Sequence, residues 1–481
     1  MRRLLLTLSV LVALNASAGT GRIIIVNVDP PGVGLNDLTP AQPVGGNPGT
    51  TLGQQRLNVY QQAAARWTTM LDTNVDILVE ASFASLLCDD TGTVLGQAGP
   101  KSVRRDFANA PQPGVWYPIA LANKFAGVDL SPSLADISMT YNSEIDNAIC
   151  QGASNWYYGF DGNEGIHSDF YVVALHELAH GLGFSGATRP PGFRDNLPSV
   201  FDLHTLDRTA GLRWSQMSEP QRQVSLTNTG NVVWDGANVK AFANRFLQPV
   251  LTLSITEPSS VAGNLDFGTA DFGPEVRTTG LSGRLVRAVD ASNSAGVSVN
   301  DGCTAFTNAD AVRGNVAAID RGNCTFLIKA QNAQAAGATA VVIADRSESY
   351  NASNPPTCLP PGMTGAGGGG DVTIPVISVG INDANALRTQ FAASATVRGS
   401  VRSDPTQLAG MSKEGNVRLY APCTDSPGSS IHHFDVTASP NLLMEFAVNP
   451  DLLLGVDLTQ FLLYDIGWTA PPRTGRRALK R

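Results

Sequence analysis

Two histidines and a glutamate stand at a spacing that can bind and use a metal ion. Residues 176–180 read His-Glu-Leu-Ala-His, so the two histidines are four positions apart. Residues four apart lie on one face of an α-helix, where two imidazoles can bind a single ion. A glutamate next to the first of them lies beside the open coordination position, where it can accept a proton from bound water. The segment therefore predicts a zinc site with His176 and His180 as ligands and Glu177 as general base.

Gly183 follows the second histidine by three residues. A glycine at this point can adopt a positive φ and turn the chain away from the helix. With this glycine the segment resembles the metzincin zinc peptidases, whose usual pattern is HExxHxxGxxH. Gly186 occupies the place of the family's third histidine. A catalytic zinc needs three protein ligands besides its water, so the third ligand must come from elsewhere.

The remaining histidines are His167, His204, His432 and His433. The segment around the last two resembles the leishmanolysin branch of the metzincins. In that branch an insertion separates the helix from a histidine that is followed by an aromatic residue, with a methionine eleven positions beyond; His433, Phe434 and Met444 have this spacing. The resemblance implies that His433 is the third ligand and that Met444 lies beneath the zinc. The family's aromatic residue is typically Trp, whereas this sequence has Phe434. The register could therefore be shifted by one residue, which makes His432 the alternative ligand.

Other candidates for the third ligand are weaker. Histidines in contexts such as those of His167 and His204 are more often surface or satisfied core residues than ligands. Glu219 lies in a polar Ser-Glu-Pro segment without the apolar helical face that a glutamate ligand requires.

The ligand set indicates the chemistry. Zinc held by three neutral imidazoles lowers the pKa of bound water to about 7 and polarises a substrate carbonyl. Glu177 can take the water proton and return it to the leaving amine. The expected activity is that of a zinc endopeptidase with one catalytic zinc ion, acting on proteins or peptides.

The elements that position these residues can be traced by periodicity. Residues 57–71 carry apolar side chains at spacings of three and four, which indicates an amphipathic helix, and Asp169 can cap the helix that carries the motif. Residues 75–83 and 137–141 alternate as half-buried strands do. We expect an α+β, zincin- or metzincin-like catalytic domain with a twisted sheet. Strand 136–143 resembles the edge strand that metzincins place above the helix for substrate; an ordinary sheet strand is the alternative.

About 250 residues separate His180 from His433, which is too many for a loop and indicates an inserted domain. The segments 320–326 (Asp-Arg-Gly-Asn-Cys-Thr-Phe) and 374–377 within it resemble a protease-associated (PA) domain that covers about residues 250–403. The resemblance implies a small β-rich module with one packed helix, which screens or binds substrate; a passive insertion is the alternative. The catalytic domain then comprises residues 19–249 and 404–470, followed by a basic tail, 471–481.

The compartment is indicated by the first eighteen residues. Two arginines precede an apolar run, 4–14, and Ala16-Ser17-Ala18 follows it, which is typical of a signal peptide cleaved after Ala18. A secreted or periplasmic location follows, and no later segment is long and apolar enough to span a bilayer. The six cysteines suit an oxidising compartment, and their positions favour the pairs Cys88–Cys150, Cys303–Cys324 and Cys358–Cys423.

Composition and net charge limit the classes of binding partner that we expect. The 481 residues carry a net charge of −8, with 33 Lys and Arg against 41 Asp and Glu, so nucleic acid is not an expected partner. We expect a monomer. The alternative function is that of a non-enzymatic secreted binding protein, in which the metal is structural and the PA module makes the interaction.

Overall fold

The computed structural model describes residues 21–471 apart from 90–91, 147–149, 151–153, 187–191, 292–297, 323, 350–358, 364, 366–370, 448–451, 453 and 454. The predicted signal peptide and nearly all of the basic tail lie outside these residues. The chain divides into two units, one made of residues 1–187 and 462–481 and the other of residues 188–461. No helix in the described part is long and apolar enough to cross a bilayer.

The first unit is built on a four-stranded sheet. Its strands are β1 (Ile23–Asn27), β2 (Ile77–Ala84), β8 (Ile137–Asn142) and β5 (Gly96–Pro100), in that order. The first three are parallel and β5 is antiparallel to β8. Alternate side chains of β2 and β8 are buried, as the period of two predicts.

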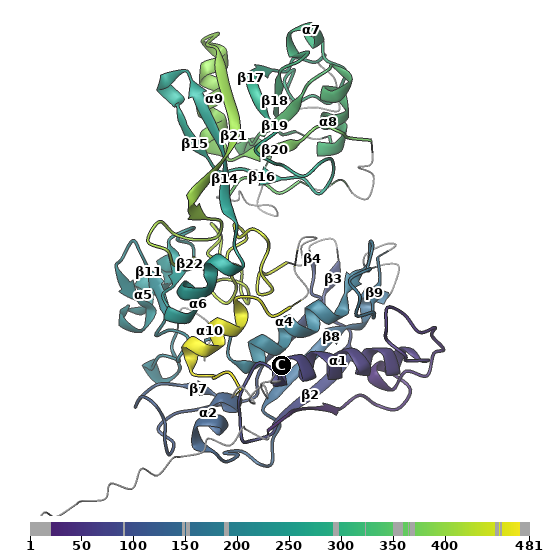
Figure 1. Ribbon diagram of the computed structural model, residues 1–481, viewed down its shortest axis with the longest axis vertical. Helices are drawn as coiled ribbons and strands as arrows, with labels where there is room; N and C mark the ends of the chain where they lie inside the picture. Colours follow the sequence, from purple (N-terminus) through teal and green to yellow (C-terminus); the bar gives the residue numbers. More distant parts are fainter. Residues whose placement is uncertain are drawn as a thin grey trace, which may run out of the picture. The chain divides into compact units, whose positions relative to one another are not determined.

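Helices α1 (Leu52–Thr68) and α4 (Phe170–Leu182) lie side by side against this sheet (Figure 1). The indole Nε1 of Trp67 donates a 3.0 Å hydrogen bond to the carbonyl oxygen of Leu175, which joins the two helices. Phe170 is fully buried and contacts the rings of Tyr141 and Trp156 at centroid distances of 4.6 and 5.0 Å. These contacts hold the first turn of α4 against the sheet, and both helix predictions are confirmed.

The remaining elements of this unit are short. They are the paired strands β3 (Cys88–Asp89) and β4 (Gly92–Thr93), β6 (Val103–Arg104) and β7 (Tyr117–Pro118), and β9 (Trp156–Tyr157) and β10 (Ser168–Asp169), with helix α2 (Ile119–Ala126). Helix α10 (Thr459–Ile466) brings the chain back to this unit.

The structure decides between the two alternatives for strand 136–143. Strand β8 has β2 on one side and β5 on the other, so it is an ordinary inner strand and β5 is the edge on that side. Alternation reports that one face of a strand is buried but not which strands flank it. Strand β5 reads Gly-Gln-Ala-Gly-Pro and has no apolar alternation to reveal it.

The second unit contains a small antiparallel sheet in the order β12 (Leu212–Arg213), β11 (Thr205–Asp207), β13 (Val232–Trp234) and β22 (Val417–Arg418). Helices α5 (Glu219–Ser225) and α6 (Ala237–Phe242) accompany it in sequence. Strands β13 and β22 pair although about 180 residues lie between them, with Val233 opposite Arg418. The two strands that flank the intervening segment are therefore neighbours in one sheet.

That segment forms an eight-stranded sheet. The order is β15 (Gly263–Leu265), β14 (Pro249–Glu257), β21 (Val397–Leu408), β17 (Ser282–Arg287), β18 (Val316–Asp320), β19 (Ala340–Ala344), β20 (Val376–Val379) and β16 (Gly268–Thr269). Strands β17 to β20 are parallel, and every residue of β18 and β19 is buried. Continuous burial is typical of parallel strands covered on both faces.

Two helices cover the two faces of this sheet. Helix α8 (Phe326–Ala335) packs in one core with Ile319 and Ile343, and α9 (Ile381–Ala392) packs in the other with Val342. A short helix, α7 (Ala309–Val312), precedes β18. The expectation of one packed helix was therefore wrong. Helix α9 is difficult to find in the sequence because half of its residues are polar and it buries only Ala384 and Leu387. Gly337, with a φ of +82°, follows the end of α8.

Two of the predicted disulfides are present, Cys88–Cys150 and Cys303–Cys324. Cys423 is also disulfide-bonded. Its predicted partner Cys358 and most of the glycine run at 365–370 lie outside the described residues.

Lys329 of α8 is fully buried beside the second disulfide. Its Nζ donates a hydrogen bond to the carbonyl oxygen of Asp301 and lies 3.5 Å from Cys303 Sγ. Burial lowers the pKa of this ammonium from 10.5 to about 8, and the nearby Asp301, Asp290 and Asp320 oppose the shift. Between these two pKa values the unfolded chain binds more protons than the folded one, so the stability of the fold increases with pH there.

We therefore predict that the free energy of unfolding of the wild type rises by about 3 kcal/mol relative to Lys329→Met between pH 8 and 10.5. Urea unfolding of both proteins at several pH values measures this difference. A difference that is constant over this range would show that Lys329 is not held as a destabilised cation.

Candidate functional site

Helix α4 presents the two motif histidines from one face. The carboxylate of Asp169 accepts hydrogen bonds from the N–H groups of Tyr171 (2.8 Å) and Val172 (3.1 Å), so it caps the helix as predicted. The rings of His176 and His180 lie 4.9 Å apart between centroids. One helical turn therefore brings the two imidazoles together.

The helix ends at Gly183, which has the positive φ that its position predicts, +122°. Its N–H bonds to the carbonyl oxygens of Ala179 and His180 at 3.1 Å. A Cβ at this position would lie 2.7 Å from Ile466 Cδ1 and 3.2 Å from Pro118 Cγ. Both the backbone conformation and the close packing therefore require glycine.

The protonation of His180 suits a metal ligand. Its Nδ1 lies 2.9 Å from the carbonyl oxygen of Phe184, and a proton on Nδ1 leaves the lone pair on Nε2. Burial lowers the pKa of the imidazole to about 4, against the opposing effect of the Phe184 hydrogen bond. The ring is therefore neutral at pH 7, which is the form that binds metals.

Glu177 is buried against the edge strand β5. Burial raises the pKa of its carboxyl group to about 8, and a hydrogen bond donated by the backbone N–H of Ala98 partly offsets this. A Cβ added at Gly96 would lie 2.8 Å from the Tyr141 ring and 3.1 Å from Glu177 Cγ. Strand β5 can therefore approach the carboxylate only with glycine at this position. Sequence reasoning missed Gly96 and Ala98, because neither belongs to a motif or a periodic pattern.

His433 and Met444 lie together in the second unit. The Nδ1 of His433 lies 2.9 Å from the carbonyl oxygen of Ser429, so His433 has the same type of Nδ1 partner as His180. The N–H of Phe434 donates a 2.7 Å hydrogen bond to the carbonyl oxygen of Met444, which is fully buried. The segment thus holds the histidine and the methionine in a defined relation. The ring of His432 instead packs edge-on against Phe201, with 5.7 Å between centroids.

The other candidates have different surroundings. His167 Nδ1 accepts a 3.1 Å hydrogen bond from the N–H of Asn155, and His204 Nδ1 lies 3.6 Å from a carboxylate oxygen of Asp235. Glu219 is exposed in the first turn of α5. That none of the three is a ligand stays a prediction.

Two family models match parts of the chain. Residues 281–387 match the PA domain, and residues 47–208, which include the HExxH motif, match a family described as SPBPB7E8-like. The chain therefore contains a PA domain within a mixed α and β structure. This agrees with the PA resemblance seen in the sequence.

The similar curated proteins are matched over short stretches. Vacuolar-sorting receptor 1 of Pisum sativum is 34% identical over 104 residues, which is 22% of this chain and 16% of the receptor. An uncharacterized protein of Schizosaccharomyces pombe, PB7E8.01, is 29% identical over 150 residues, which is 29% of this chain and 25% of that protein. Aminopeptidase YwaD of Bacillus subtilis is 36% identical over 110 residues, which is 23% of this chain and 22% of the enzyme. The chain thus spans at most a quarter of the length of these relatives.

Among solved structures, a zinc aminopeptidase from Bacillus subtilis is similar with a TM-score of 0.22 and 21% identity, over 35% of this chain and 37% of that one. An aminopeptidase from Aneurinibacillus sp. strain AM-1 has a TM-score of 0.21 and 15% identity, over 44% and 42% of the two chains. Likeness at this level supports no conclusion about the fold or activity of this chain.

Proposed function

We propose that this protein is a secreted zinc endopeptidase of the metzincin type, similar to leishmanolysin, in which His176, His180 and His433 bind one catalytic zinc ion. The observation that carries the proposal is the geometry of α4, which holds the rings of His176 and His180 4.9 Å apart on one helical face, next to the buried Glu177. The Nδ1 partners of His180 and His433 support it, because a carbonyl acceptor at Nδ1 directs the other nitrogen toward a metal. His432, packed against Phe201, is the weaker third ligand.

Zinc bound there would supply an activated water and polarise the substrate carbonyl. The protein's own contribution is proton transfer by Glu177, which takes the proton of the attacking water and returns it to the leaving amine. The backbone N–H of Ala98 donates a hydrogen bond to this carboxylate, which helps to orient it. The edge strand β5 is proposed to pair with extended substrate through its backbone.

The proposed organisation keeps a catalytic domain in two parts, 19–249 and 404–470, around a PA domain at 250–403. The pairing of β13 with β22 supports this division, because it joins the two sides of the insertion. The disulfides Cys88–Cys150 and Cys303–Cys324 support a secreted or periplasmic protein, since disulfides persist in oxidising compartments.

An aminopeptidase is the second candidate, favoured by the match to Aminopeptidase YwaD. That match spans 22% of the enzyme, so it bears on a part of the protein rather than on its whole activity. The third possibility, a binding protein with a structural metal, is disfavoured by a buried glutamate next to His176.

Hydrolysis of casein separates these candidates. We expect the purified protein to cleave internal bonds of casein, to lose this activity with a chelator and to recover it with one equivalent of zinc. Release of single N-terminal residues without internal cleavage would favour the aminopeptidase. If the protein binds zinc but hydrolyses neither casein nor an aminoacyl amide, the result would favour the binding protein.

Gly96 gives a further prediction for the site. Replacing Gly96 with Ala places a methyl group against Tyr141 and Glu177, so β5 or the carboxylate has to move. We expect kcat to fall by about 10- to 100-fold, because a shift of about 1 Å at a catalytic group can have this effect. Zinc content should not change, since the atoms nearest to this Cβ position belong to Tyr141 and Glu177 and not to a proposed ligand.

Kinetics and elemental analysis of the variant measure these two quantities, with Gly99→Ala as the matched control. Gly99 is on the same strand, and a Cβ there meets no atom within 4 Å. Equal losses of activity in both variants would refute a specific role for Gly96.

A further inference from the structure

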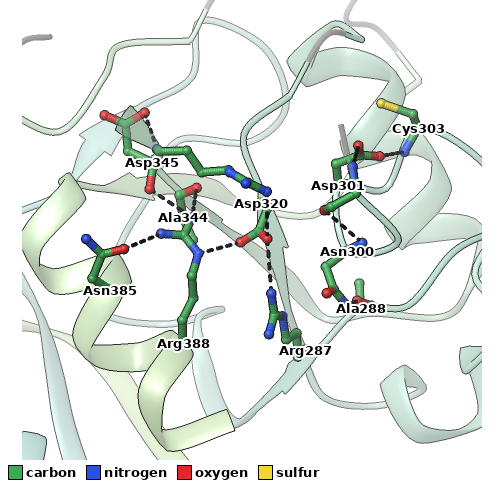
Figure 2. Close-up of polar contacts among 12 residues, drawn as sticks. Arg287, Ala288, Asn300, Asp301, Cys303, Asp320, Ala344, Asp345, Asn385 and Arg388 are labelled. Carbon is green, nitrogen blue, oxygen red and sulfur yellow. Dashed lines mark hydrogen bonds and ion pairs between the residues drawn. The ribbon is translucent and has the colours of Figure 1, made fainter. Parts of the chain in front are cut away.

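Arginine side chains gather at the carboxyl ends of parallel strands in the PA module (Figure 2). Arg287 ends β17, Asp320 ends β18, and Asp345 directly follows β19. The two aspartates are 3% and 0% exposed. Ligands of parallel sheets bind at this edge, where loops leave the strands.

Three guanidinium groups converge on one carboxylate. Asp320 Oδ2 accepts hydrogen bonds from Arg287 Nη2 at 3.1 Å and from Arg346 Nη1 at 3.5 Å. Asp320 Oδ1 accepts one from Arg388 Nε at 2.9 Å. Arg388 also donates to the carbonyl oxygens of Ala344 (3.0 Å) and Asp345 (2.8 Å), so its role is to tie α9 to the ends of the strands.

Further charged side chains surround Asp320. Arg321 pairs with Asp345 at 3.2 Å, and buried Lys329 faces Asp301 and Asp290 on the inner side. Among the described side chains of this group, five are basic (Arg287, Arg321, Arg346, Arg388 and Lys329) and four are acidic (Asp320, Asp345, Asp301 and Asp290). The acidic groups lie inside.

The basic side chains reach the surface. The side chains of Arg287 and Arg346 are 31% and 20% exposed, whereas that of Asp320 is 4% exposed. A buried carboxylate thus holds two guanidinium groups whose side chains are partly exposed. An anion placed over them would offset the repulsion between the like charges.

We propose that this face of the PA module, centred on Arg287 and Arg346, binds the carboxylate groups of acidic peptides. Guanidinium groups present paired N–H donors that match the two oxygens of a carboxylate, and anchoring by Asp320 reduces the entropy lost on binding. Two neighbouring guanidinium groups in a chain with a net charge of −8 suit a short acidic segment rather than a long polyanion. The inference does not depend on the zinc site.

Binding of a fluorescent peptide to the full chain tests this proposal. The Glu177→Gln variant is used so that the peptide is not consumed. The probe carries three glutamates and a C-terminal amide, and the comparison peptide has glutamine in their place. We expect the glutamate peptide to bind at least about 10-fold more tightly than the glutamine peptide. One charge-assisted contact that contributes about 1.4 kcal/mol would give this difference. Equal affinities for the two peptides would refute the proposal.

Substitution of Arg287 locates the site. Arg287→Gln should weaken binding of the glutamate peptide by about 5- to 10-fold, and Arg287→Lys by less, because lysine keeps the charge but not the paired donors. Arg284→Gln is the matched control, since Arg284 is exposed on the same strand and three positions away, on the opposite face of the sheet.

Each outcome of the series is decisive. An equal effect of Arg284→Gln would indicate general attraction by charge and overturn the assignment, as would unchanged binding by Arg287→Gln. A phosphoserine version of the peptide that binds more tightly than the glutamate version would overturn the choice of carboxylate. If Arg287→Gln fails to fold, Arg287→Lys and Arg346→Gln provide the same comparison.

Discussion

Replacing Glu177 with Gln should leave zinc bound and reduce peptide hydrolysis by about 10²- to 10⁴-fold, the range attributable to a general base. Glutamine has nearly the shape of glutamate but cannot accept and return the water proton. Glu177 is not one of the proposed ligands, and its carboxylate accepts a hydrogen bond from the backbone N–H of Ala98. Zinc content by elemental analysis and kcat on a casein-derived peptide measure the two effects separately.

Glu219→Gln is the control for this experiment, because it makes the same chemical change at an exposed glutamate in α5. Its activity should equal that of the wild type. Turnover retained in Glu177→Gln would exclude the proposed base, and loss of zinc in that variant would mean that Glu177 acts on the metal rather than on water.

Substitution of His433 by Ala should lower zinc affinity by more than about 100-fold, because loss of an outer partner of a ligand alone costs 10- to 100-fold. Two imidazoles from α4 would remain, which is fewer than the three protein ligands of catalytic zinc sites. Peptide hydrolysis should fall with the bound metal. Titration of the metal-free protein with zinc, monitored by calorimetry, measures the affinity.

The neighbouring variant His432→Ala is the matched control. It removes an imidazole one position away whose ring packs against Phe201, so zinc affinity should remain within a few-fold of the wild type. The opposite result, with zinc lost in His432→Ala and kept in His433→Ala, would shift the ligand by one residue. Retention of zinc in both variants would exclude a ligand from this segment.

Much of the local structure near the site could be predicted from sequence. The spacing of apolar residues located α1, β2 and β8, and Asp169 and Gly183 marked the two ends of α4. Caps, periodicity and glycine conformation depend on neighbouring residues, so a single sequence reports them. The positions of the cysteines suggested the pairs Cys88–Cys150 and Cys303–Cys324.

The candidate third ligand is a different case. His433 and Met444 were suggested by the resemblance to the leishmanolysin branch, since no periodicity links a residue to a helix about 250 positions earlier. Their role as ligand and supporting methionine stays a prediction. What the structure adds is the hydrogen bond between Phe434 and Met444 and the different surroundings of His432.

The amino-acid sequence by itself determined the helix that carries His176, Glu177 and His180, because that pattern is written within a few turns of chain. Only the tertiary structure decided that β5, not β8, is the sheet edge beside Glu177, and that Arg287, Arg346 and Arg388 converge on Asp320. Such contacts join residues tens of positions apart, and their partners depend on strand order and packing, which local patterns do not contain.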